Sequence, residues 1–139
     1  MEYRRAAVAD FLPIAALDRT AWSRNRNAEF IPDGEHVWRL WVEHGLVFCA
    51  VHEDEIVGAI VAFPCLSGSF CVHKAFVVEP LRGQQVGTHL FEVLLAELDR
   101  LGAASFLTVD PINDAGIRLY EKWGYTERRF VKGYYRPHE

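Results

Sequence analysis

The order of strand-like and helix-like segments predicts an α/β domain in which a mixed sheet carries helices on both faces. Two amphipathic helical segments are followed by three strand-like segments, and a helix-strand-helix-strand run completes the chain. In the middle, strand 70–78, helix 85–101 and strand 105–109 form a βαβ crossover, which places its two strands parallel. The length of 139 residues and the 50% hydrophobic content fit one globular domain spanning 1–139.

The first part of the chain predicts a short strand and two helices. Glu2–Ala6 fits an edge strand, and Asp10 fits the cap of a helix that runs to about residue 22. We expect the inward face of this helix to carry Leu12, Ile14, Leu17 and Ala21. Residues 23–33 are polar and predict a loop. The second helix, at about 34–44, has an apolar face made of Val37, Trp38, Leu40 and Trp41.

The middle of the chain changes to a strand pattern. Leu46–His52 and Ile56–Phe63 are rich in Val, Ile and Phe, and the acidic turn 53–55 between them predicts a hairpin. A turn at 64–69 leads to a third strand, Phe70–Val78. Strict alternation along it puts Cys71, His73 and Ala75 on one face, with Val72 and Lys74 on the other.

The last part predicts a helix, a strand, a second helix and a terminal strand or hairpin. Apolar residues recur every three or four positions through the helix at 85–101, at Val86, Leu90, Leu94, Leu98 and Leu101. Phe106–Val109 predicts a short buried strand that Pro111 ends. A helix at about 114–123 stops at Gly124, and Tyr125–Arg136 predicts the final strand or tight hairpin.

Charge and composition exclude several classes of protein. The formal net charge is −4 and no run of basic residues exceeds two, so a general nucleic-acid binder is excluded. No apolar stretch approaches the roughly 20 residues that span a bilayer, and the N-terminus does not fit a signal peptide. The three cysteines lack metal-ligand spacing and fit reduced thiols. We expect a cytoplasmic protein without a metal or a membrane partner.

The turn before the long helix is the most informative segment. A strand ends at Val77 and Val78, and the sequence Glu79-Pro80-Leu81-Arg82-Gly83 leads into the helix. The first N–H groups of a helix have no intrahelical partners and lie at its positive end, so such a turn can cradle a phosphate. Neither the dinucleotide Gly-x-Gly-x-x-Gly pattern nor a P-loop is present.

Two spaced motifs resemble the GNAT N-acetyltransferase superfamily. Residues 82–87, RGQQVG, are similar to its coenzyme A pyrophosphate loop, and residues 109–125, VDPINDAGIRLYEKWGY, are similar to its Asn, Ala, Leu-Tyr, Gly-Tyr signature. Gln85 departs from the pattern, because the family usually has a glycine there. The resemblance implies the GNAT acyl-CoA N-acyltransferase fold, a mostly antiparallel sheet with one parallel strand pair and about four helices. It also implies an acetyltransferase that uses acetyl-CoA.

The resemblance carries roles onto individual residues. It implies backbone contacts from Val77, and less so Val78, to the pantetheine arm. Contacts to the diphosphate are implied for Arg82, Gly83, Gln84, Gln85, Val86, Gly87 and Thr88. Asn113 matches a residue that contacts the arm, although it also fits a helix cap. Tyr120 matches the general acid near the CoA sulfur, although its spacing alone fits packing on its own helix.

The general base and the acceptor stay open at this stage. Family bases often lie on the fourth strand, where His73 and Glu79 are the leading ionisable residues. The family's acceptor pocket points to residues 22–41, whose charged members are Glu29, Asp33, Glu35 and His36. Trp38 and Trp41 fit core packing as well as a substrate platform.

Three functions remain open. The first is acetyl transfer to a small-molecule or peptide amine. The others are protein N-terminal acetylation of the ribosomal-protein type and acyl-CoA sensing without turnover. A homodimer is common in the family.

Overall fold

The computed structural model describes residues 1–22, 32–108 and 114–126. The chain divides into two compact units, Met1–Leu107 and Thr108–Glu139, and each is described separately below. Several predictions lie outside the described residues: most of the loop at 23–33 with the predicted acceptor residue Glu29, the position of Asn113, and the strand or hairpin beyond residue 126. Within the described part, no helix combines the length and apolar character that crossing a membrane requires.

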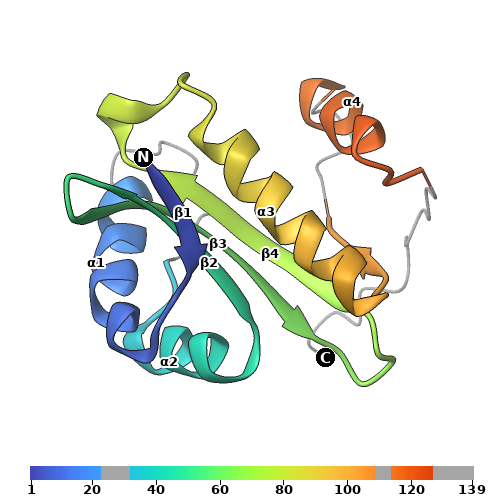
Figure 1. The fold of residues 1–139 in the computed structure, drawn as a ribbon, viewed down its shortest axis with the longest axis horizontal. Helices are drawn as coiled ribbons and strands as arrows, with labels where there is room; N and C mark the ends of the chain where they lie inside the picture. Colours follow the sequence, from blue (N-terminus) through green and yellow to red (C-terminus); the bar gives the residue numbers. More distant parts are fainter. Residues whose placement is uncertain (23–31, 109–113, 127–139) are drawn as a thin grey trace, which may run out of the picture. The chain divides into compact units, whose positions relative to one another are not determined.

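The first unit is built on one five-stranded sheet (Figure 1). Its order follows the chain, and its strands are β1 (Glu2–Arg5), β2 (Leu46–His52), β3 (Glu55–Pro64), β4 (Phe70–Val77) and β5 (Ser105–Phe106). The first three junctions are antiparallel, and β4 pairs with β5 in parallel. The mixed sheet, its hairpin and the parallel βαβ pair are therefore confirmed.

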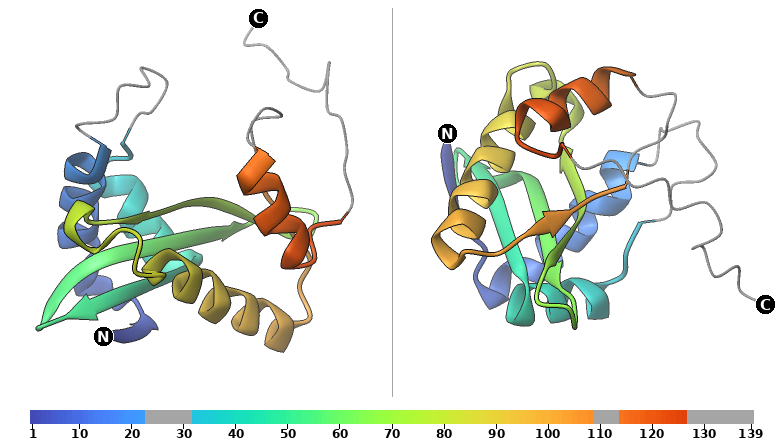
Figure 2. Two further views of the ribbon diagram at one scale, coloured as in Figure 1. Left: turned by 90° about the horizontal axis from the view of Figure 1, so that it is seen from above. Right: turned by 90° about the vertical axis from the view of Figure 1, so that its right-hand side faces the viewer.

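Helices cover both faces of this sheet, as the sequence predicts. The helices of the first unit are α1 (Phe11–Trp22), α2 (Glu35–His44) and α3 (Val86–Leu101), with single 3-10 turns η1 (Val8–Asp10) and η2 (Glu79–Leu81). α1 and α2 lie on one face and α3 lies on the other (Figure 2). The second unit contributes α4 (Asp114–Lys122), so the described residues contain four α-helices.

Each face of the sheet has its own apolar core. On the α1/α2 face, Ile14, Trp38 and Val42 pack with Val47, Val61 and Phe76 of the strands. On the other face, α3 buries Val86, Leu90, Phe91, Leu94 and Leu98, as its predicted spacing requires. The periodicity of α3 is therefore confirmed over four of its five predicted positions.

Several predicted core positions are exposed. They are Leu12, Val37, Leu40, Leu101 and Phe106, each at least 36% accessible. On α1, Phe11 packs against the core in place of Leu12. On α2, Val42 is buried at 8% exposure, so the inward face centres on Trp38 and Val42. With about 3.6 residues per turn, each helix buries a narrower apolar face than the inward residues predicted for it would form.

The prediction that Asp10 caps α1 is wrong in its detail. Asp10 is the last residue of η1, and its Oδ2 accepts a hydrogen bond from the backbone N–H of Ala7 at 2.7 Å. The same oxygen lies 2.7 Å from Nη1 of Arg4. Asp10 therefore closes the turn that precedes α1 and ties it to β1.

A bulge in β4 overturns the predicted alternation of its side chains. β3 pairs Ala62 with Val72 and Val61 with Lys74, which leaves His73 as the extra residue. Because Val61 belongs to the α1/α2 core, Lys74 lies on that face, where His73 also lies. One inserted residue thus turns two consecutive side chains toward the same helices.

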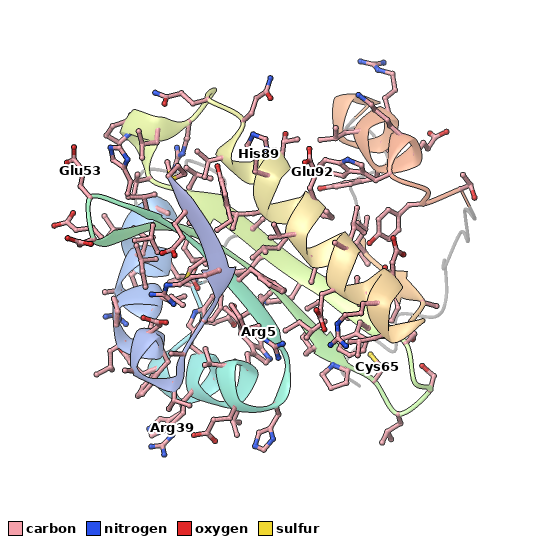
Figure 3. The ribbon with its side chains drawn as sticks, in the orientation of Figure 1. Arg5, Arg39, Glu53, Cys65, His89 and Glu92 are labelled. Atoms are coloured by element: carbon pink, nitrogen blue, oxygen red, sulfur yellow. The ribbon has the colours of Figure 1, made fainter. Side chains whose placement is uncertain are left out.

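The two ends of β3 are marked by tight turns (Figure 3). Glu53 and Asp54 before β3 have φ values of +51° and +65°, the left-handed pair that a two-residue hairpin turn requires. Cys65 follows β3, and its N–H donates to the carbonyl of Ser69 at 2.8 Å. The strand between them supplies the centre of the sheet on which the site is built.

α4 in the second unit ends in a Schellman motif. Gly124 has a φ of +98°, its N–H donates to the carbonyl of Glu121, and the N–H of Tyr125 donates to that of Tyr120 at 3.0 Å. The rings of Tyr120 and Tyr125 meet edge to face at 6.4 Å. The predicted stop at Gly124 is confirmed. The ring contact with Tyr125 helps to fix the orientation of the Tyr120 side chain.

Candidate functional site

The edge of β4 opens immediately beyond its short pairing with β5. β5 pairs with β4 only at Phe70 and Cys71, so in the described part of the chain residues 72–77 have β3 on one side and no strand on the β5 side. The N–H of Val78 donates to the carbonyl of Val57 on β3 at 2.8 Å. Because successive residues alternate direction, the backbone groups of Val77 point toward the open edge. The N–H of Val77 is thus placed to pair with an extended ligand, whereas the carbonyl of Val77 accepts from Nε of Arg82 and the N–H of Val78 already has a partner.

The open edge leads into the turn before α3. η2 ends at Leu81, Gly83 has a φ of +81°, and α3 begins at Val86. The helix start has no side-chain cap and no acidic residue in its first turn. A Cβ added at Gly87 would meet only Cγ2 of Val77, at 4.0 Å. The positive end of α3 is therefore open to an anion, with free space at its second residue.

Gln85, the departure from the family pattern, adopts a left-handed conformation that a glycine reaches at lower cost. Its φ of +64° and ψ of +19° place it in the left-handed region. A residue with a Cβ pays about 1–2 kcal/mol for this conformation. The loop thus keeps a glycine-like path while Gln85 accepts the first helical bond, from the N–H of His89 at 3.0 Å.

Arg82 braces this turn. Its Nε donates to the carbonyl of Val77 at 3.0 Å and its Nη2 donates to the carbonyl of Ala21, near the end of α1, at 2.9 Å. The guanidinium therefore ties the turn to β4 and to α1. An additional bond to a phosphate would use another of the five guanidinium N–H donors or replace one of these two carbonyls.

A network of charged side chains lies on the α1/α2 face of β4. Nζ of Lys74 lies 3.0 Å from Oδ2 of Asp18 and 2.6 Å from Oδ2 of Asp33. The side chains of Lys74 and Asp18 are only 6% and 0% exposed. Nε2 of His73 lies 3.1 Å from the same oxygen of Asp33. The network therefore connects the buried ion pair of Lys74 and Asp18 to the partly exposed imidazole of His73.

Asp18 accepts most of the hydrogen bonds that hold this network together. Its Oδ2 accepts hydrogen bonds from the backbone N–H of Asp33 at 2.9 Å and from Nε1 of Trp38 at 3.0 Å. Its two oxygens also accept from Lys74. One buried carboxylate thus joins α1, the segment before α2, α2 itself and β4.

An aromatic group borders the imidazole of His73. The ring of Trp41 lies 4.9 Å from it, and the ring of Phe63 lies 5.8 Å from it. Trp41 and Phe63 stack at 5.9 Å with an interplanar angle of 4°. Trp38 is fully buried and packs in the core, whereas Trp41 is half-buried beside the charged network.

The structure brings together only part of the predicted base and acceptor residues. His73 and Asp33 are in contact, whereas Glu79 is exposed in η2, beyond the end of β4. Glu35 instead pairs with Arg19 on the surface of the α1–α2 pair. The sequence pattern did not indicate Asp18, and the alternation predicted for β4 placed Lys74 on the wrong face. Asp18 follows Ile14 by four residues, so a charge on the inward face of α1 was the available signal.

The thiols in this region are protonated at neutral pH. Burial raises the pKa of Cys71, and burial raises the pKa of Cys49 to about 11. Because the thiolate is the reactive form, neither is an activated nucleophile. The described cysteines are all free of disulfides. This arrangement gives no support to a covalent cysteine intermediate.

Tyr120 in the second unit keeps its proton over a wide pH range. Burial raises the pKa of its phenol above the ordinary value of 10.0. A phenol with a raised pKa is a donor rather than a base at neutral pH. Tyr120 therefore has the protonation state that a general acid requires.

The comparisons with known proteins agree with this fold. The sequence pattern of the Acetyltransferase (GNAT) family matches residues 12–125. The chain belongs to this family and is an acyltransferase. The family uses acetyl-CoA as its cosubstrate. A search of curated proteins found no match.

Solved structures, two acetyltransferases among them, share the fold at low sequence identity. The ribosomal-protein-S18-alanine N-acetyltransferase from Escherichia coli has a TM-score of 0.73 and 22% identity, over 92% of this chain and 79% of that chain. An aminoglycoside acetyltransferase, meta-AAC0020, from an uncultured soil metagenomic sample, in complex with sisomicin, has 0.69 and 19%, over 92% and 90%. The tetramutant of BH1408 from Bacillus halodurans has 0.67 and 23%, over 93% and 96%.

Proposed function

We propose that the chain transfers the acetyl group of acetyl-CoA directly to a primary amine of a small molecule or peptide. The observation that carries the proposal is the open edge of β4, which runs into the uncapped N-terminus of α3. An extended arm with amide groups can pair with such an edge, and a diphosphate can bind at such a helix end. The two features lie in the order that acetyl-CoA requires.

The binding roles follow from this arrangement. Val77 would pair with the pantetheine arm, and its neighbour Val78 would help to set the direction of the chain at that point. The diphosphate would bind the backbone N–H groups of the turn and first helical residues, which are Gly83, Gln84, Gln85, Val86, Gly87 and Thr88. Arg82 would hold the turn in place and add a positive charge. Asn113 is proposed to contact the arm on the strength of its motif position.

The acceptor must lose a proton before it can attack. A lysine-like amine with a pKa of about 10.4 is almost wholly an ammonium at pH 7, and its neutral form costs about 4–5 kcal/mol. His73 is the base that the geometry favours, because its imidazole is partly exposed beside the open edge of β4. Glu79, on the exposed η2 turn, is the second candidate.

The transfer itself makes one bond and breaks one. Acetyl-CoA supplies the activated acetyl thioester. The neutral amine forms the nitrogen–carbon bond, the carbon–sulfur bond breaks, and Tyr120 gives its proton to the departing thiolate. Tyr120 then recovers the second proton that the nitrogen loses as the amide forms. Its role rests on its motif position, and burial, which raises the pKa of its phenol, keeps the phenol protonated at neutral pH.

A turnover screen tests this function. Release of free CoA is followed with amino acids, polyamines, aminoglycosides and short peptides as acceptors, over a range of pH. The proposal predicts acceptor-dependent release with at least one primary amine. Peptides that outperform all free amines would favour protein N-terminal acetylation. Tight CoA binding without release for any acceptor would contradict the proposal and favour a sensor.

Substitution Tyr120→Phe tests the acid role. A thiolate has a pKa of about 8.5 and leaves without much help, so loss of the phenol is expected to lower kcat about 10²-fold rather than abolish it. The matched control is Tyr125→Phe, which removes a hydroxyl from the ring that contacts Tyr120. Equal kcat values for Tyr120→Phe and the unsubstituted protein would remove this role.

A further inference from the structure

The charged network on β4 buries more charge than a contact that only stabilises the fold requires. Lys74 and Asp18 are almost completely buried, and Asp33 is one-quarter exposed. Taking such charges out of water costs several kcal/mol each, and apolar side chains of similar size often stabilise a protein as well or better. A buried ion pair is thus weak evidence for a stabilising role, and its connection to an exposed group calls for another explanation.

The network leads to one exposed group, the imidazole of His73. Nε2 of His73 lies 3.1 Å from Oδ2 of Asp33, and a carboxylate can only accept a hydrogen bond. In the neutral ring Nε2 must therefore carry the hydrogen, which leaves the lone pair on Nδ1. In the described part of the chain no residue donates to Nδ1. The contact thus selects the tautomer whose Nδ1 can take a proton.

The charges also favour a positive imidazole. The charged groups that face His73, directly or through Asp33, are the carboxylates of Asp33 and Asp18 and the ammonium of Lys74. Among the described residues, this set has one net negative charge. A positive charge that forms on His73 is therefore stabilised by Asp33.

We propose that Asp33, held in place by Lys74 and Asp18, positions His73 to accept the proton of the amine substrate at Nδ1. Asp33, Lys74 and Asp18 are positioning residues and do not touch the substrate. In this step the ammonium gives one proton to Nδ1, the imidazolium hydrogen-bonds to Asp33, and the proton leaves to water after transfer. The inference rests on the proposed function, because it supplies that reaction with its base.

Nuclear magnetic resonance of ¹⁵N-histidine-labelled protein tests the positioning without any acceptor. Long-range ¹H–¹⁵N spectra distinguish the two neutral tautomers. The proposal predicts that neutral His73 carries its hydrogen on Nε2 in the unsubstituted protein. A neutral ring with its hydrogen on Nδ1 would overturn it. Because this measurement needs no variant, it stands even if a substitution prevents folding.

Two substitutions are expected to move the titration of His73 in opposite directions. Asp33→Asn removes the negative partner and should lower the midpoint, and Lys74→Met removes a positive neighbour and should raise it. His44, at the end of α2 and 72% exposed, is the internal control in the same spectra. A His73 midpoint that does not move in Asp33→Asn would overturn the proposal.

The same variants separate this inference from the proposed function. The acid limb of the pH profile of kcat/KM should shift downward in pH for Asp33→Asn and upward for Lys74→Met. Acceptor-dependent CoA release with an unshifted acid limb would leave the proposed function intact and overturn the positioning network. Failure of release in the unsubstituted protein, with the predicted tautomer and midpoint shifts present, would instead overturn the acetyl transfer.

Discussion

The two faces of the central sheet are stabilised by different chemistry. Under α3 the buried side chains are apolar, with Leu90 and Leu94 at 0% exposure. Under α1 and α2 the apolar core surrounds Asp18 and Lys74, which are also buried. Apolar burial is non-directional and contributes stability wherever surfaces meet, whereas buried charges require matched partners. The α3 face is therefore stabilised by apolar burial, whereas the α1/α2 face combines an apolar core with the charged network that we propose positions His73.

The bulge in β4 produces this difference. Without it, Lys74 would face α3, where no described acidic residue is buried. With it, His73 and Lys74 both reach Asp33. Bulges are common next to active sites, because they redirect a side chain without ending the strand.

The largest expected effect is on the α3 face. Leu94→Ala leaves a cavity in a sealed apolar core and should lower the free energy of unfolding by about 2–5 kcal/mol. Denaturant-induced unfolding measures the change. The control is Leu101→Ala on the same helix, where the side chain is 46% exposed and the cost should stay below about 1 kcal/mol. Equal losses for the two variants would break the comparison.

A smaller effect is expected on the charged face. Asp18→Asn keeps the shape and one acceptor oxygen but removes the charge that Lys74 pairs with. Hydrogen bonds to charged groups contribute about 1.5–3 kcal/mol each, so we expect a loss in that range by the same unfolding measurement. A loss as large as that of Leu94→Ala would mean that the network is a main source of stability.

Gln85, the left-handed residue before α3, extends the comparison of the two faces to the turn that is proposed to bind the diphosphate. Gln85→Gly keeps the left-handed conformation but removes its cost of about 1–2 kcal/mol for a residue with a Cβ. The greater conformational freedom of glycine in the unfolded chain offsets about 0.5–1 kcal/mol of this gain. We expect a net gain of about 1 kcal/mol or less in unfolding experiments. Gln85→Ala keeps the strain and is the control. A destabilised Gln85→Gly protein would show that the glutamine side chain contributes more than its backbone costs.

The smallest effect is expected from the partly buried pair of Arg4 and Asp10 at the edge of the first unit. Arg4 holds the pKa of Asp10 below its ordinary value, first through their hydrogen bond. A lowered folded-state pKa contributes stability that is present above the unfolded pKa, near 3.9, and is lost as the pH falls through the folded value. The difference in unfolding free energy between the unsubstituted protein and Asp10→Asn should be below about 1 kcal/mol at pH 7 and shrink toward pH 2. A difference that grows on acidification would contradict this sign.

Much of the fold could be predicted from the sequence, because periodicity and turn chemistry act locally. The hairpin, the βαβ unit and the stop at Gly124 depend on residues close together in the chain. The predictions failed where burial or side-chain direction depends on how the strands pair in the sheet. Phe106 is exposed because β5 consists of only two residues, Ser105 and Phe106. Alternation in β4 failed because a bulge depends on the pairing with β3.

The candidate site divides in the same way. The turn from Val77 to Thr88 was predictable because its motif is continuous in the sequence. The network of Asp18, Asp33 and Lys74 was not, because its members are 15 to 56 residues apart and meet only when α1 packs on β4. Asp18 was hidden for a further reason, since a charged residue on an apolar helix face gives no indication of its partner.

The most direct test of the account is a titration of ¹⁵N-labelled protein with CoA, followed by the backbone amide signals. The account predicts the largest shifts at Val77 and at residues 86–88, because the open strand edge and the first turn of α3 receive the ligand. The amides of Ser67 and Gly68, in the β3–β4 turn at the opposite end of β4 from Val77, should stay unchanged. Saturating CoA that leaves the first turn of α3 unperturbed would contradict the account.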